Sequence, residues 1–382
     1  MKKALMLLTL GVLTLAACQK APVPAKDATL EGQKVAVDAF LGMAQKIFVL
    51  NEGGMGANNA TLDFLRLSDG MYITGAFKKM NPGASAGLGD VGNDIAVHGN
   101  EVWMVINNSG IVEVVSAADE TEIAVIEIPT PRNIAFDDKY AYVTSWAGAF
   151  ATYGADYSIT DSANPKGQVY RISLSTHKVE GSVEVGYQPE GIAYYDGKLY
   201  VANSGGISSQ LPPTYAYDNT VSIIDAASFK VTETIEVQVN LKYVYADGNG
   251  NIYVTTLGNF YDVHSGLYRI DPQGKASKVS DYVSVSALLG STVYCIGTDS
   301  EFDWQAAHVY KGFSVSGGTK ADWNLSVSAT TLYSLCAVDP DTFLVGDAGD
   351  YFNPGSVICY NNGSKLWSVA AGVCPGHFAI WK

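Results

Sequence analysis

The feature that most constrains this chain is a short pattern that recurs along it. Each copy has an apolar strand led by Pro or Gly, a turn, and a second strand ending in a small polar residue. The clearest copy runs from Pro189 to Asn203, and others begin near residues 91, 131, 241, 285 and 331. The period is roughly 40 to 58 residues. A unit of this size made only of strands cannot bury its own faces, so the pattern predicts radial repetition, a β-propeller.

The two ends of the pattern predict how the ring closes. Residues 375–380 have the pattern of a first strand with no second strand after it, whereas the copy at 47–51 is a second strand without a first. If the C-terminal strand completes the first blade, no open sheet edge remains. We therefore expect an all-β, seven-bladed β-propeller over residues 46–382. Its blades are marked by Ile47, Ile95, Ile134, Ile192, Val244, Ala287 and Leu335.

Residues 1–17 have the features of a secretory signal peptide. Met1-Lys2-Lys3 precedes an apolar run, residues 4–17, that is too short to span a membrane. The run ends in Leu15-Ala16-Ala17-Cys18, which resembles a bacterial lipobox. That resemblance implies that Cys18 is lipidated and becomes the first residue of the mature chain; the alternative is an ordinary signal peptide with an incidental cysteine. Residues 18–45 are then expected to form a tether.

The charge of the chain excludes one class of partner. The formal net charge is −14, and only four arginines occur among 382 residues. Such a chain offers no basic stripe to a phosphate backbone, so we expect no nucleic-acid partner.

The four remaining cysteines, Cys295, Cys336, Cys359 and Cys374, lack the spacing of a zinc site. We interpret them as buried free thiols, and a disulfide is the alternative. Gly83–Gly87 and Gly87–Gly92 fit a nucleophile elbow and a dinucleotide fingerprint, but no helix follows either. The histidines have no ligand spacing, and only His377, near the predicted tunnel mouth, is of interest. We therefore expect no metal and no cofactor.

The long loops of this chain carry aromatic residues on one predicted face. In a propeller, the connection from strand two to strand three and the link between blades emerge around the same tunnel mouth, where loops on a rigid scaffold carry function. We expect these aromatics to bind a ligand; the alternative is that they pack the loops together. The candidates are Trp146, Phe150, Tyr153, Tyr157, Tyr187, Tyr215, Tyr217, Phe260, Tyr261, Phe302, Trp304, Tyr351 and Phe352.

The links between blades add residues at equivalent positions of the repeat. These are Asn93, Arg132, Glu190, Lys242 and Gly376. The side chains of Arg132, Glu190 and Lys242 are candidates for binding the polar edge of a ligand. The alternative is a rim that is solvated or paired within itself, with Glu190 between two cations.

The pair of segments 199–203 and 219–225 resembles the YVTN/YncE-like propeller repeat, over about residues 46–382. With the lipobox, the chain resembles propeller lipoproteins of Bacteroidota that work beside TonB-dependent outer-membrane transporters. Among them the BtuG family captures vitamin B12 and related corrinoids. The resemblance implies a lipid-anchored outer-membrane protein, not an enzyme, that captures cobalamin, another corrinoid or a similar bulky small molecule for such a transporter.

Three questions stay open. Residues 19–22 lack the acidic cluster often seen in surface-exported lipoproteins, so both the cell surface and the periplasmic side are possible locations. A metal-dependent lactonase or lyase would need carboxylates that converge in the tunnel, for which Glu52, Asp94, Glu190 and Asp347 are available. A surface protein-interaction module would instead use the aromatic face to bind a partner.

Overall fold

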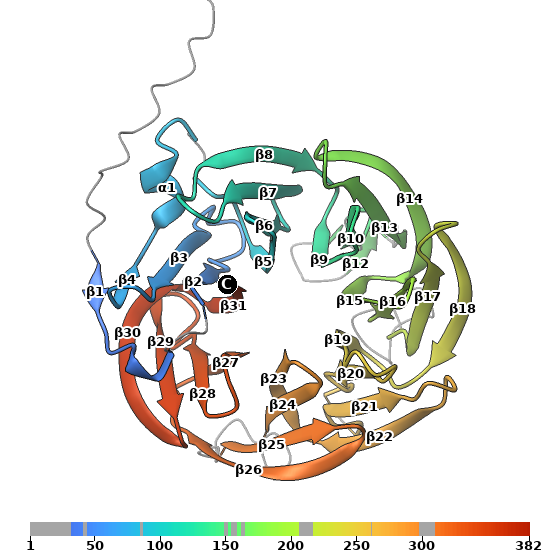
Figure 1. The fold of residues 1–382 in the computed structure, drawn as a ribbon. Helices are drawn as coiled ribbons and strands as arrows, with labels where there is room; N and C mark the ends of the chain where they lie inside the picture. The colour runs from blue at the N-terminus through green and yellow to red at the C-terminus, as the bar shows by residue number, and fades with distance from the viewer. Residues whose placement is uncertain are drawn as a thin grey trace, which may run out of the picture.

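The structure is a computed structural model that describes residues 32–40, 44–84, 87–148, 165–205, 217–260, 262–297 and 310–382, with the backbone alone of 152–153 and 159–161. Over these residues the sheets form a ring of seven blades around a central channel (Figure 1). The seven-bladed, all-β propeller predicted from the repeat is confirmed. The described residues contain no helix long and apolar enough to cross a membrane.

Each blade is an antiparallel sheet whose first strand lies at the channel and whose fourth lies at the outside. From the inside outward, blades 1 to 3 are β31 (Pro375–Trp381), β2 (Lys46–Asn51), β3 (Thr61–Arg66), β4 (Met71–Ile73); β5 (Gly92–His98), β6 (Glu101–Ile106), β7 (Ile111–Ser116), β8 (Glu122–Glu127); and β9 (Pro131–Phe136), β10 (Tyr140–Ser145), β13 (Lys166–Ser173), β14 (Lys178–Tyr187).

Blades 4 to 7 repeat the same order. They are β15 (Pro189–Tyr195), β16 (Lys198–Asn203), β17 (Thr220–Asp225), β18 (Lys230–Glu236); β19 (Leu241–Ala246), β20 (Ile252–Thr256), β21 (Gly266–Ile270), β22 (Ala276–Asp281); β23 (Val283–Leu289), β24 (Thr292–Gly297), β25 (Tyr310–Ser316), β26 (Thr319–Val327); and β27 (Leu332–Ala337), β28 (Thr342–Asp347), β29 (Pro354–Asn361), β30 (Ser364–Val373). Outside the blades lie the hairpin β11 (Thr152–Tyr153) and β12 (Ile159–Asp161), and the helix α1 (Ala76–Met80).

The ring closes as the sequence predicts. The C-terminal strand β31 pairs antiparallel with β2, from Lys46 opposite Trp381 to Asn51 opposite Pro375. In Figure 1 the red strand β31 accordingly lies on the channel side of the blue strand β2. The first blade is thus built from both ends of the chain.

A short segment before the first blade also packs onto the ring. Strand β1 (Gln33–Lys34) pairs with β4 as a fifth strand, and a 3₁₀ turn (Asp38–Phe40) follows. Phe40 is 2% exposed and packs beside Trp367 of blade 7, whose indole Nε1 donates to the Ala36 carbonyl at 2.9 Å. We call residues 33–40 the strap, because they span the seam between blades 1 and 7. The strap lies within the predicted tether of residues 18–45.

The burial of the strands explains the repeated pattern. Second strands such as β2 and β28 are buried along their whole length, because neighbouring blades cover both faces, and they therefore read as continuous apolar runs. The outer strand β18 is almost entirely exposed. Small polar residues at the ends of second strands bind the link between blades 2 and 3: Nδ2 of Asn107, just after β6, donates to the Pro131 carbonyl at 2.9 Å, and the hydroxyl of Ser145, the last residue of β10, donates to the Pro129 carbonyl.

All four described cysteines are buried and free, which confirms the interpretation from sequence. Cys336 and Cys359 lie on either side of Leu344, as its partners on β27 and β29. Their Cα atoms are therefore two strand spacings apart, about 9.5 Å. A disulfide needs Cα atoms closer than about 7 Å, so this pair cannot form one without movement of the backbone. Burial raises the pKa of the Cys336 thiol to about 12.

Candidate functional site

Each inner strand carries a β-bulge at the end where it begins, at the mouth of the channel. In β5, Gly92 is opposite Ile106 and Asp94 is opposite Val105, so Asn93 is an extra residue. The other six inner strands show the same irregularity. A bulge leaves its extra residue unpaired and re-aims its side chain. We call the second residues of these strands the rim: Asn93, Arg132, Glu190, Lys242, Ser284, Tyr333 and Gly376.

The sequence predicted five of the seven rim residues. Ser284 and Tyr333 were missed because their copies of the repeat, near residues 285 and 331, are degenerate in sequence. The one signal that could have located them is the spacing of the apolar residues farther along each copy of the repeat.

The chain turns sharply before it reaches the rim. The residue just before an inner strand has a positive φ in six of the seven blades, and none of the six is glycine. Such residues cost about 1–3 kcal/mol each and persist where the surrounding structure determines them. The turn therefore holds the start of each inner strand, and with it the rim, in a defined orientation. The six residues and their φ values are Val91 (61°), Thr130 (40°), Gln188 (44°), Asn240 (60°), Tyr282 (61°) and Cys374 (53°).

In blades 2 to 4 the rim is paired within itself. Asn93 Nδ2 donates to the Arg132 carbonyl at 2.7 Å. The Arg132 guanidinium donates to the Glu190 carboxylate through Nε and Nη2, at 2.9–3.1 Å, and both side chains are largely buried. The indole ring of Trp146 lies 4.4 Å from the Arg132 guanidinium carbon. Of the two cations expected beside Glu190, Arg132 therefore forms the ion pair.

In blade 1, whose rim residue is Gly376, the Glu52 carboxylate takes the place of a rim side chain. His377 Nε2 lies 3.1 Å from Glu52 Oε1, and the Tyr333 hydroxyl donates to Glu52 Oε2 at 2.6 Å. Burial raises the pKa of Glu52, but the hydrogen bond and charge of His377 and the hydrogen bond of Tyr333 outweigh it, so this pKa lies below its usual value. A Cβ at Gly376 would lie 2.5 Å from Glu52 Oε1, so a larger residue there would displace the Glu52 carboxylate from Tyr333 and His377.

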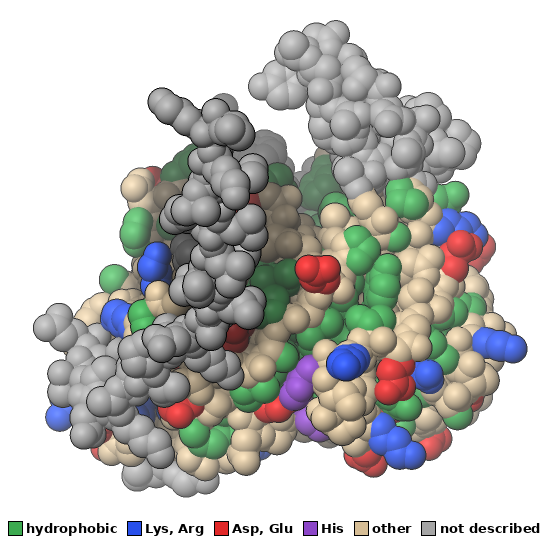
Figure 2. All heavy atoms as spheres, turned by 90° about the horizontal axis from the view of Figure 1, so that it is seen from above, with side chains coloured by type: hydrophobic (Ala, Val, Ile, Leu, Met, Phe, Trp, Pro, Cys, Tyr) green, Lys and Arg blue, Asp and Glu red, His purple; other side chains and the backbone are tan. Residues whose placement is uncertain are grey.

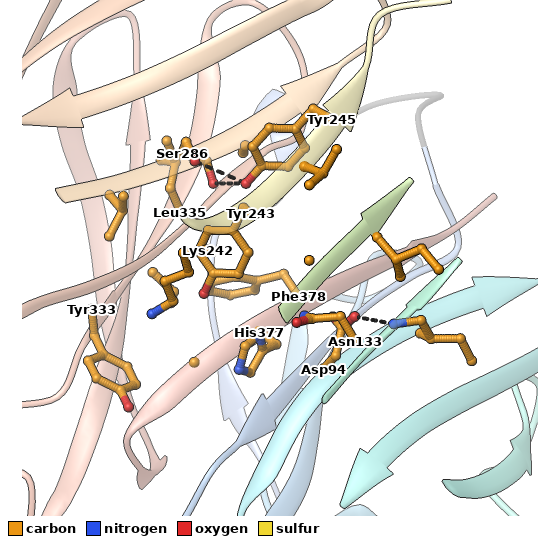
Figure 3. A pocket seen from close by; sticks show the side chains of 18 of the residues that line it. Asp94, Asn133, Lys242, Tyr243, Tyr245, Ser286, Tyr333, Leu335, His377 and Phe378 are labelled. Carbon is orange, nitrogen blue, oxygen red and sulfur yellow. Dashed lines mark hydrogen bonds between the residues drawn. The ribbon is translucent and has the colours of Figure 1, made fainter. Parts of the chain in front are cut away.

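Below the rim, the inner strands enclose a cavity of about 280 Å³ (Figure 3). Its wall is polar: Asp94 Oδ2 accepts from the Ile134 backbone N–H at 2.9 Å, and the Tyr245 hydroxyl lies 3.0 Å from Ser286 Oγ. Burial raises the pKa of Asp94, against the charge of His377. Sites for drug-sized ligands usually measure about 300–1,000 Å³. This cavity therefore suits one side group of a larger ligand.

Lys242 is the rim cation that has no ion-pair partner in the part of the chain that the structure describes. Its side chain is half-buried, lines the cavity, and has its ammonium 5.0 Å from the Tyr243 ring centre. No carboxylate of the described residues lies within ion-pair distance of it. Figure 3 shows Lys242 on the same side of the cavity as Tyr333 and His377. The next rim residue, Ser284, is exposed.

The most exposed large apolar side chains of the described residues gather on the mouth face. Phe352 is 85% exposed, Met55 81%, Phe260 71% and Tyr351 50%. All four lie between the second and third strands of blades 1, 5 and 7, on the side where the inner strands begin. Phe260 and Tyr351 also have positive φ values, 60° and 68°. We call these four residues the apolar sector, because they occupy the arc from blade 5 through blade 7 to blade 1.

The other predicted aromatics divide into two groups. Trp146, Tyr187 and Tyr217 are half-buried, and Trp146 packs on Arg132, as expected for residues that pack loops together. The side chains of the second group, together with the predicted lipidation site Cys18, lie outside the described residues: Phe150, Tyr153, Tyr157, Tyr215, Tyr261, Phe302 and Trp304. Met55 was missed by the sequence analysis, which considered aromatic residues only.

The carboxylates proposed for a catalytic metal site have other partners. Glu52 contacts His377, Glu190 pairs with Arg132, and Asp94 accepts from the Ile134 backbone. Asp347 accepts from three backbone N–H groups, those of Thr330, Thr331 and Gly349. Over the part of the chain that the structure describes, no three His, Cys, Asp or Glu side chains converge as a metal site requires.

The surface around the ring mixes both signs of charge. In Figure 2, which is turned by 90° from the view of the ring in Figure 1, blue Lys and Arg side chains lie among red Asp and Glu side chains on the described surface. A phosphate backbone is bound by a continuous basic stripe, which this view does not show among the coloured side chains.

Comparison with known proteins places the chain in a family. Residues 45–311 match the sequence model of the domain of unknown function DUF5074. No curated protein matches the chain. Among solved structures, it is similar to the hydrazine synthase of Kuenenia stuttgartiensis, with a TM-score of 0.54 and 14% identity over 75% of this chain and 88% of that one. A structure of U3-55K matches with a TM-score of 0.47 and 10% identity, over 72% of this chain and 78% of that one. The likeness to hydrazine synthase shows the fold alone, whereas the DUF5074 match covers more than half of the chain, and the protein therefore belongs to the DUF5074 family.

Proposed function

We propose that this protein captures a bulky, flat small molecule across the mouth of its channel. The observation that carries the proposal is the apolar sector, in which Phe352, Met55, Phe260 and Tyr351 are 50–85% exposed. Large apolar side chains cost free energy when they face water, and a group of them beside polar residues is how a ligand-binding surface is built. Other exposed apolar residues of the described chain lie singly or in pairs on outer strands.

The shape of the site favours a ligand that rests on the face. The cavity of about 280 Å³ accommodates one side group, so the body of the ligand would lie above it, against the apolar sector. A corrinoid has this form, because its wide ring is largely apolar and carries amides at its edge. The resemblance to the BtuG family also favours a corrinoid such as cobalamin. The same proposal includes lipidation of Cys18, an outer-membrane location and delivery of the ligand to a TonB-dependent transporter.

The test is a titration of the purified protein with cyanocobalamin, followed by calorimetry and by absorbance. Truncation of an anchor residue in a binding site typically costs about 2 kcal/mol or more, which is about thirtyfold in Kd. We expect Phe260→Ala with Phe352→Ala to weaken binding at least that much while the melting temperature stays unchanged.

The matched control truncates two exposed apolar residues on outer strands, Val231→Ala and Leu366→Ala, which are 38% and 46% exposed. These changes should leave Kd unaltered. Absence of corrinoid binding by the parent protein would end the corrinoid proposal. Equal losses in the two double variants would show that the apolar sector is not the site.

A further inference from the structure

We propose that the rim at blades 5 and 6 is a subsite for an oxyanion, a carboxylate or phosphate carried by the ligand. Lys242 would supply the positive charge and Ser284 a hydroxyl donor. The inference rests on the proposed function in that the body of the same ligand lies on the apolar sector. It adds the chemical class of the ligand: a flat apolar body with one anionic oxygen group at its edge.

Among the described residues, Lys242 is the cation of the mouth that has no carboxylate within ion-pair distance. Arg132 is neutralised by the Glu190 carboxylate at 2.9 Å. The Glu52 carboxylate is held by the Tyr333 hydroxyl and His377. Lys242 attracts Glu52 over a longer distance, without a hydrogen bond or ion pair between them.

The position of Lys242 makes this ammonium effective. Its side chain is half-buried at the edge of a cavity of about 280 Å³, where charges are screened less than in open water. It lies over the face of the Tyr243 ring, and none of its three N–H donors is bonded to a described residue. The bulges of β19 and β23 aim Lys242 and Ser284 at the mouth from neighbouring blades.

The subsite and the apolar sector are connected through blade 5 and through Tyr333. Phe260 belongs to the same blade as Lys242. Tyr351 packs edge-on against the rim residue Tyr333, at 5.9 Å between ring centres. Lys242 and Tyr333 both line the cavity (Figure 3). In this proposal, a ligand whose apolar body rests on Phe260 and Tyr351 places a group of its inner edge at the Lys242 ammonium.

The experiment compares two fluorescent probes of one shape and different charge. Anionic 1-pyrenebutyrate and neutral 1-pyrenebutanol are titrated against the parent protein, Lys242→Gln, Lys242→Arg and Lys198→Gln. Lys198 is an exposed lysine at the start of β16, at the opposite end of its blade from the rim, and serves as the matched control.

The expected result is a preference for the anion that depends on Lys242. Charge-assisted hydrogen bonds in partly buried sites are stronger than surface ion pairs, so we expect the parent and Lys198→Gln to bind pyrenebutyrate at least fivefold more tightly than pyrenebutanol. Lys242→Gln should bind the two probes equally, and Lys242→Arg should restore the preference. Added salt should weaken the binding of pyrenebutyrate to the parent protein and to Lys198→Gln, but not to Lys242→Gln.

Equal binding of the two probes by the parent, a preference that survives in Lys242→Gln, or binding of neither probe would overturn the subsite. Competition of bound pyrenebutyrate by acetate and by phenyl phosphate then shows which oxyanion fits better. The pyrene titrations do not involve a corrinoid. A failure of cobalamin to bind would therefore overturn the corrinoid proposal alone, because the pyrene titrations test the oxyanion subsite independently.

Discussion

A buried carboxyl in the second blade makes the stability of this protein depend on pH. Glu113 lies in the middle of β7, is 3% exposed, and its Oε1 has no hydrogen-bond partner. Burial, together with the charge of Glu122, raises the pKa of Glu113 from 4.5 to about 8. We predict that Glu113→Gln stabilises the protein at neutral pH.

The sign and the size follow from this pKa. Between pH 4.5 and 8 the unfolded chain releases a proton that the folded chain retains, so the free energy of unfolding falls as the pH rises through this window. At pH 7 the interval from 4.5 covers 2.5 pH units at about 1.36 kcal/mol each, or about 3 kcal/mol. Glutamine is close in shape to the protonated acid and cannot ionise. It should therefore match the parent at pH 4.5 and exceed its stability by about 3 kcal/mol at pH 7.

The assay is urea unfolding of the parent and Glu113→Gln at intervals from pH 4.5 to 8, with melting temperatures at the same pH values. Glu180→Gln is the control, because Glu180 lies on the outer strand β14 and is exposed in both states. The reasoning would be refuted if the free energy of unfolding of Glu113→Gln did not exceed that of the parent at pH 7, or exceeded it by the same amount at every pH.

Three further predictions concern the ends of the chain. Deletion of Pro375–Lys382 should expose the edge of β2 and cause aggregation or a large fall in melting temperature; a monomeric variant that melts like the parent would contradict closure by β31. Phe40→Ala should destabilise the protein by about 3–5 kcal/mol, as for other buried aromatics, and Trp367→Ala should also destabilise it, whereas an unchanged urea midpoint in both would show that the strap adds nothing to the core. Cys18→Ser should move the protein from the membrane fraction to the soluble fraction with the melting temperature unchanged, and continued membrane retention would point to another anchor.

The fold could be predicted from the sequence because the same strand pattern occurs in several copies along the chain. The seven inner strands recur at similar spacing, so an atypical copy such as Val283–Leu289 can be located from the copies before and after it. The strap has no such support: β1 is two residues long, and the burial of Phe40 depends on Trp367, more than 300 positions away. The residues around Phe40 contain no pattern that predicts a contact with Trp367.

The site could be predicted only in part, for a related reason. Equivalent positions in the repeat identified Arg132, Glu190 and Lys242 as rim residues. Which of them are paired depends on distances across the ring. Arg132 has a carboxylate at 2.9 Å, whereas Lys242 has none within ion-pair distance among the described residues. The exposure of Met55 and Phe352 likewise depends on how their loops fold back.

The bulges at the channel mouth have a consequence for how such a protein can change. The extra residue of a bulge has no partner across the ladder, so its replacement leaves the ladder hydrogen bonds of its blade in place. Gly376 is the exception, because a side chain there would collide with Glu52. Asn93, Arg132, Glu190 and Tyr333 also have partners that a substitution would leave unpaired, whereas Lys242 and Ser284 can each be replaced without loss of a hydrogen bond or ion pair to a described residue. A lineage that keeps this ring can therefore acquire a new ligand by single substitutions at these positions, without passing through an unstable intermediate.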